Sequence, residues 1–144
     1  SAVAPGAVVL EVEGLCVPGD RGREAVSSIS FTVREGEIFG IAGVSGNGQR
    51  ELVEAVTGLR RSSRGAVRLS GRDITNVSAR VAGDLGISHV PEERIRFGIV
   101  PNLLVFENAV LKQHRNRLFS RSMFLDERAM RDRAADIVAR LAVR

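Results

Sequence analysis

Residues 37–50, EIFGIAGVSGNGQR, join an apolar segment to a glycine-rich turn that opens a helix. The apolar stretch 37–43 contains no proline and predicts a strand, while the amphipathic stretch 51–59 predicts a helix with Gly58 as its stop. Glycines let backbone N–H groups point into such a turn, and the helix behind it adds a partial positive charge. The pattern therefore predicts a phosphate-binding loop, although similar turns also occur simply to close a tight strand-to-helix connection.

The loop departs from the GxxxxGK[ST] motif at two positions. Gly43 and Gly48 fit the two glycines of the motif. Gln49 stands where the motif has lysine, and Arg50 stands where it has the serine or threonine that ligates Mg²⁺. Arg50 restores a positive charge near the phosphates, but a guanidinium cannot ligate a metal. We therefore expect weak binding of ATP at most, and the loop argues against retained Mg²⁺ binding. The four residues between the glycines are Val44, Ser45, Gly46 and Asn47.

Composition narrows the class of protein. The 144 residues are 44% apolar, which is enough for one compact domain with a core. Cys16 is the only cysteine, so we expect no internal disulfide and no multi-cysteine metal site. No apolar run approaches the roughly 20 residues that span a bilayer, and the start SAVAPGA lacks a basic signal-peptide region, so a soluble chain is expected.

The charge balance argues against nucleic-acid binding. The net charge is +4, and Lys112 is the only lysine among 21 basic residues. The arginines are spread along the chain, and the aromatic residues are few, so no basic cluster with interleaved stacking side chains is present in the sequence.

Alternating apolar residues predict further strands. Segments 8–12, 29–33 and 65–71 alternate and are expected to be antiparallel and half-solvated, with Ile29, Phe31 and Val33 pointing inward. A turn at 34–37 leads into the strand of the loop, and a second core strand is expected at 86–90.

Helices are predicted from caps and apolar spacing. Ser78 caps a short helix that ends near residue 85, and a further helix is expected around 105–113. The last helix begins at Asp126 and carries one apolar stripe, which we interpret as packing surface. The stripe consists of Met130, Ala134, Ile137, Val138 and Leu141.

Four stretches carry a family resemblance: LEVEGLCVPG (10–19), SSISFTVREGEIFGIAGVSGNGQRELVEAVTGL (27–59), GAVRLSGRDIT (65–75) and GISHVPEERIRFGIVPNLLVFENAVL (86–111). They cover most of the chain. Together they resemble the first part of an ATP-binding cassette, the nucleotide-binding domain of ABC transporters. GNGQ followed by EL, with VPEER in place of a glutamine-containing loop, is most similar to the second cassette of tandem-cassette importers for simple sugars and nucleosides.

The resemblance implies an α/β fold of the P-loop NTPase class, present as a fragment of the cassette. Residues 1–36 and 65–75 would form the antiparallel β subdomain. Residues 37–59 and 76–92 would form part of the RecA-like core. Residues 93–144 would hold the Q-loop region and the start of the helical subdomain.

The resemblance also implies roles for individual residues. Glu92 takes the place of the Q-loop glutamine, which senses metal and contacts the membrane partner, although a solvated surface glutamate is an equal alternative. The aromatic residue that stacks on adenine would lie near Val17 and Pro18, where this chain has none. The residues implied to face the phosphates are Gly43, Ser45, Gly46, Asn47, Gly48, Gln49 and Arg50.

The implied parent is an import ATPase, cytoplasmic and peripheral on the membrane, that docks a permease subunit through residues 91–115 and pairs with a second cassette. The chain ends before the family's signature motif, Walker B aspartate and catalytic glutamate, so we expect no catalytic residue, no metal ligand and no hydrolysis by this chain alone. Two alternatives remain open. One is a noncatalytic interaction module that self-associates through the stripe on the last helix, and the other is a soluble ABC-type ATPase that acts on nucleic acid.

Overall fold

The computed structural model of the chain describes residues 6–44, 46–114, 116–121 and 124–142. They divide into two compact units, Ser1–His89 and Val90–Arg144, each described here by itself. The sequence predicts the boundary between the core and the helical region after residue 92, close to the boundary between these two units.

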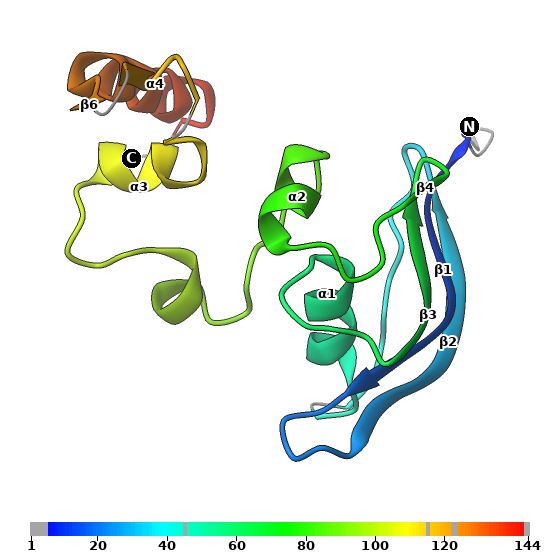
Figure 1. Cartoon of the computed structure of the whole chain (residues 1–144). Helices are drawn as coiled ribbons and strands as arrows, with labels where there is room; N and C mark the ends of the chain where they lie inside the picture. The colour runs from blue at the N-terminus through cyan, green and yellow to red at the C-terminus, as the bar shows by residue number, and fades with distance from the viewer. Residues whose placement is uncertain (1–5, 45, 115, 122–123, 143–144) are drawn as a thin grey trace. The chain divides into compact units, whose positions relative to one another are not determined.

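A four-stranded antiparallel sheet in the order β2-β1-β3-β4 forms the base of the first unit (Figure 1). Its strands are β1 (Val8–Pro18), β2 (Glu24–Arg34), β3 (Arg64–Leu69) and β4 (Arg72–Asp73). Val12 pairs with Phe31 on β2 and with Val67 on β3, which fixes the register of the long strands. The antiparallel prediction is confirmed, but β1 and β2 are longer than predicted. Ile29 is 38% exposed, so its expected inward orientation is wrong, whereas Phe31 and Val33 are half-buried.

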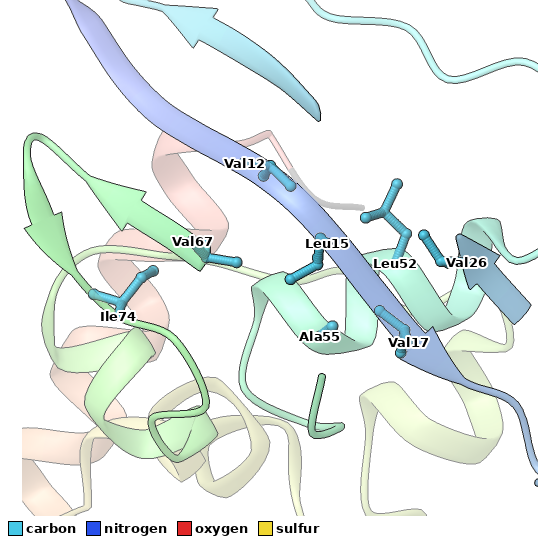
Figure 2. Close-up of a cluster of buried hydrophobic side chains, with 8 residues drawn as sticks. All are labelled: Val12, Leu15, Val17, Val26, Leu52, Ala55, Val67 and Ile74. Atoms are coloured by element: carbon cyan, nitrogen blue, oxygen red, sulfur yellow. The ribbon is translucent and has the colours of Figure 1, made fainter. Parts of the chain in front are cut away.

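The core of the first unit lies between the sheet and helix α1 (Gln49–Val56), as Figure 2 shows. Apolar side chains from β1, β2 and β3 meet one face of α1, and a register shift in β1 between Val12 and Leu15 lets these two residues, three positions apart, join the same cluster. Leu52 and Ala55 are the buried residues of that helix face. The buried cluster consists of Val12, Leu15, Val17, Val26, Leu52, Ala55, Val67 and Ile74.

Helix α1 ends earlier than predicted. Thr57 is its C-cap, and Gly58 follows with φ +75°, so the glycine stop is confirmed. Leu59, the last residue of the predicted helix, lies beyond α1 and is 57% exposed. Helix α2 (Ala79–Asp84) follows β4, and the hydroxyl of Ser78 accepts a hydrogen bond from the Val81 N–H, which confirms the predicted cap.

Two predicted core strands are wrong. The structure describes no strand pairing over 37–43 or 86–90, although both segments are apolar. A strand takes its hydrogen bonds from its neighbours, and the described chain places no neighbouring strand beside either segment. Ile38 is 99% exposed as a result, while Phe39 stacks on Phe31 with ring centroids 4.8 Å apart.

The second unit is mainly helical. A π-helical turn at Arg94–Gly98, which the sequence did not indicate, precedes α3 (Val105–Val110) and a 3₁₀ turn at Leu111–Gln113. The helix predicted around 105–113 is thereby confirmed. Two short strands, β5 (Ser120–Arg121) and β6 (Phe124–Leu125), form a separate antiparallel pair that was not predicted.

Helix α4 (Glu127–Arg140) packs on α3 and is the last helix among the described residues. The carboxylate of Asp126 accepts a hydrogen bond from the Ala129 N–H at 3.1 Å, which confirms the predicted start. Met130 and Ala134 are buried, and Met130 packs with Val110 and Phe119 in the small core of this unit. The stripe was predicted too long, because Val138 and Leu141 are exposed.

Candidate phosphate-binding loop

The turn ahead of α1 is held open by two glycines in left-handed backbone conformations. Gly46 has φ +89° and Gly48 has φ +91°, a region that favours glycine over any residue with a Cβ. A Cβ on Gly48 would lie 2.2 Å from the backbone oxygen of Ala25 on β2, so the loop can pass this strand only with glycine there. The sequence therefore fixes the path of the loop at these two positions.

The N-terminus of α1 faces this turn, and its N-cap residue provides no side-chain cap. Gly48 is the N-cap, and it has no side chain to accept from the first N–H groups of the helix. The Leu52 N–H is the first to bond within the helix, to the Gly48 carbonyl at 2.9 Å. N–H groups at the start of a helix attract anions because their partial positive charges add. The loop backbone therefore suits a phosphate group.

Gln49 folds back over the loop instead of extending outward. Its side-chain amide donates to the Val44 carbonyl at 3.3 Å. The same amide nitrogen lies 2.0 Å from where a Cβ on Gly43 would be, so the absence of a side chain at Gly43 makes room for it. The Asn47 N–H donates to the same Val44 carbonyl at 3.2 Å and tightens the turn. Gln49 thus stabilises the loop itself and supplies no charge for phosphate.

Arg50 makes ion pairs with carboxylates. Its Nη2 lies 2.5 Å from Asp20 Oδ2 and 3.0 Å from Glu51 Oε1, and its Nε lies 3.9 Å from Glu54 Oε1. Hydrogen bonds to Asp20 and then Glu51 raise the pKa of the guanidinium further above its ordinary value. The cation that could replace the missing lysine is therefore engaged by protein groups.

A second arginine binds the same carboxylate. Arg60 Nη2 lies 2.6 Å from Asp20 Oδ1, and Arg60 Nε lies 2.7 Å from Glu54 Oε2. Arg60 also donates to the Pro18 carbonyl at 3.1 Å, which ties the turn between β1 and β2 to the end of α1. Hydrogen bonds from Arg60 and then Arg50 hold the pKa of the Asp20 carboxyl below its ordinary value.

The structure brings together most of the predicted site residues. Gly43, Asn47, Gly48 and Gln49 form the turn, with Gly46 at its exposed tip and Arg50 on the first helical turn. Ser45 lies outside the described residues. Glu92 is exposed in the second unit and is not among the residues gathered by the first.

Sequence reasoning missed Asp20 and Arg60. They lie 30 and 40 positions from their partners Arg50 and Asp20, and no local pattern connects residues so far apart. The only signal was a single carboxylate within the basic turn GDRGR at 19–23.

Over the described ranges, the His, Cys, Asp and Glu side chains form no group of three placed to hold a metal ion. Arg50 occupies the metal-ligand position of the loop, and a guanidinium has no lone pair to offer, so this side chain does not fit Mg²⁺. Among the helices that the structure describes, none is long and apolar enough to cross a lipid bilayer.

Comparison with known proteins assigns this geometry to a family. A family model described as ABC transporter matches residues 26–144. A glucose import ATP-binding protein of Haloferax volcanii is 46% identical over 142 residues, covering 99% of this chain and 26% of that protein. A guanosine import ATP-binding protein of Bacillus subtilis is 40% identical, covering 99% and 28%. The chain thus spans about a quarter of the length of the curated relatives it matches.

Solved structures show the same fold. An ATP-binding cassette of an ABC transporter superposes with a TM-score of 0.70 at 22% identity, covering 95% of this chain and 55% of that one. A nucleotide-free ATP-binding cassette superposes with a TM-score of 0.63 at 23% identity, covering 74% and 41%. The α/β cassette fold expected from the sequence is confirmed.

Proposed function

Because the chain belongs to the ABC transporter family, we propose that it is the phosphate-loop part of a nucleotide-binding domain in an import ATPase for simple sugars or nucleosides. The names of the similar proteins from Haloferax volcanii and Bacillus subtilis support this class of transported solute. The GNGQ and VPEER motifs further favour the second of two tandem cassettes.

One observation carries the nucleotide-binding part of the proposal: the uncapped N-terminus of α1 opens onto a turn shaped by Gly46 and Gly48. The backbone N–H groups there would hold the phosphates of ATP, and the glycine at position 46 leaves space beside them. ATP, once bound, supplies the phosphoryl group whose transfer drives transport in a complete cassette pair.

The side chains of the loop favour binding over chemistry. Gln49 bonds to the loop carbonyl of Val44, and Arg50 bonds to carboxylates, so neither is placed as the motif's lysine and metal ligand would be. We infer that this half of the parent binds nucleotide weakly and that hydrolysis takes place at the partner cassette. Residues 91–115 of the second unit, with Glu92 at the Q-loop position, would dock a permease on the cytoplasmic face of the membrane.

The second candidate function is a noncatalytic module that does not bind nucleotide. The ion pairs of Arg50 favour it, because they occupy the cation that would attract phosphate. The two candidates differ in one measurable property, which is ATP binding by the folded chain.

Calorimetric titration with ATP, with and without Mg²⁺, tests the proposal. We expect a dissociation constant between about 10 μM and 1 mM, changed little by removing Mg²⁺ because Arg50 replaces the metal-binding hydroxyl. Gly46→Asp should abolish binding, since it places a carboxylate where the phosphates would lie, and its Cβ would meet no atom within 4 Å.

Gly71→Asp is the matched control. Gly71 has φ +80° in the β3–β4 turn, and a Cβ there also meets nothing within 4 Å, so the strain and the added charge are comparable. ATP binding should survive this change. If the folded chain does not bind ATP at millimolar concentration, or if both variants lose binding equally, ATP binding cannot be assigned to this loop.

A further inference from the structure

Five charged side chains surround the beginning of α1. Three carboxylates, from Asp20, Glu51 and Glu54, face the guanidiniums of Arg50 and Arg60, which leaves an excess of one negative charge. A phosphate group that approaches the N-terminus of α1 therefore meets a guanidinium that is already paired with carboxylates.

Asp20 differs from the other two carboxylates in where it comes from. Glu51 and Glu54 lie on the same helix as Arg50, whereas Asp20 belongs to the turn between β1 and β2. Its contact with Arg50 is the shortest of the three, and it is the first cause of the raised pKa of that guanidinium. The turn between β1 and β2 thus brings the Asp20 carboxylate to the Arg50 side chain from outside the phosphate-binding loop.

The ion pair between Arg50 and Asp20 is exposed enough to solvent for Arg50 to change partner. The side chains of Arg50 and Asp20 are 55% and 60% exposed. Ion pairs exposed to this degree are weak because water screens them, and a triphosphate carries several charges against the one on Asp20. A bound phosphate can therefore replace the carboxylate without unfolding any element.

We propose that Asp20 is an internal competitor for Arg50, which holds the guanidinium while the loop is empty and must be displaced when a phosphate chain binds. The competition weakens phosphate binding and makes the turn between β1 and β2 respond to occupancy of the loop. This proposal rests on the proposed function, since the loop must bind phosphate for the phosphate and the Asp20 carboxylate to compete.

Arg60 keeps the competing carboxylate in place. Its guanidinium binds Asp20, Glu54 and the Pro18 carbonyl, and its side chain is only 20% exposed. When Arg50 leaves, Asp20 remains bonded to Arg60, and the turn stays attached to α1 through Arg60 and Pro18. The Asp20→Asn variant should therefore fold.

The test measures the affinity of the chain for inorganic tripolyphosphate and for ATP in four variants. Asp20→Asn should tighten both by about two- to five-fold, the range of exposed charge pairs. In the Arg50→Gln background the same change should have no effect, because there is no guanidinium left to release. Glu13→Gln, which removes a carboxylate paired with Arg68 on the sheet, should leave both affinities unchanged.

Arg60→Gln separates competition from a merely structural role of Asp20. If Asp20 competes for Arg50, Arg60→Gln should bind phosphate more weakly, because Asp20 then pairs with Arg50 alone. If Asp20 only ties the turn to the helix, Asp20→Asn and Arg60→Gln should change the affinity in the same direction. Wild-type binding with no gain in Asp20→Asn would overturn the competition and leave the proposed function standing. If no folded variant binds ATP or tripolyphosphate at about 10 mM, roughly ten times the weakest dissociation constant expected for the chain, both proposals fail.

Discussion

Gly46 and Gly48 share a backbone conformation but differ in what surrounds them. Both have φ near +90°, yet a Cβ on Gly46 meets open space while a Cβ on Gly48 would strike the Ala25 backbone. A side chain at position 46 would only strain the backbone. A side chain at position 48 would also clash with β2, which would have to move to relieve the clash. The two residues therefore allow strain and close packing to be measured separately.

Gly48→Ala should lower the free energy of unfolding by about 2–4 kcal/mol, because it combines a disfavoured backbone conformation with a backbone clash. Gly46→Ala should cost only about 1 kcal/mol. Urea unfolding monitored by circular dichroism checks both values. Equal costs would mean that the loop does not pass β2 as closely as the structure shows.

The residues of the loop were predictable, but their partners were not. The glycine spacing alone located Gly43, Gly48 and the two departures from the motif, because a phosphate loop is defined by consecutive residues. The pairing of Arg50 with Asp20 depends on how a strand turn lies against a helix end. Such a contact exists only after folding, and so the single sequence contained no signal for it.

At the scale of elements, the sequence predicted helices from their own caps and strands from their own alternation. The caps Ser78 and Asp126 marked true helix starts, and alternation found β1, β2 and β3. Segments 37–43 and 86–90 have the apolar composition of buried strands but no pairing among the described residues. An apolar run predicts burial, whereas a strand also needs a neighbour, which composition does not specify.

Asn108 determines the conformation of the segment ahead of α3. Its Oδ1 accepts from the Val100 N–H at 2.8 Å, and its Nδ2 donates to the carbonyls of Val100 at 3.1 Å and Leu103 at 3.1 Å. One side chain therefore replaces several backbone bonds in the region that we propose docks a permease.

Asn108→Ala should lower the stability of the second unit by about 1–3 kcal/mol, because it leaves several backbone groups without their partner. The Val100 amide should exchange with deuterium much faster, while the amides of the β1–β2 sheet keep their protection. Asn102→Ala, at an exposed asparagine in the same segment, is the matched control. Unchanged exchange at Val100 would show that Asn108 does not hold the segment.

At the scale of the whole molecule, the first unit contains a loop suited to phosphate, and the second contains the segment proposed for docking. The chain spans about a quarter of the length of the import ATP-binding proteins that it matches, and transport is part of the proposed function alone. Recognition of nucleotide phosphate by backbone N–H groups is the part of the proposed function that can be tested on the chain by itself.

Titration of the ¹⁵N-labelled chain with ATP, followed through its backbone amide signals, tests that recognition most directly. We predict that the largest shifts occur at the amides of residues 46–51, where the uncapped start of α1 meets the glycine turn, with smaller shifts at Asp20 as Arg50 changes partner. A well-dispersed spectrum that stays unchanged at millimolar ATP, or that shifts only in residues 90–142, would contradict the account.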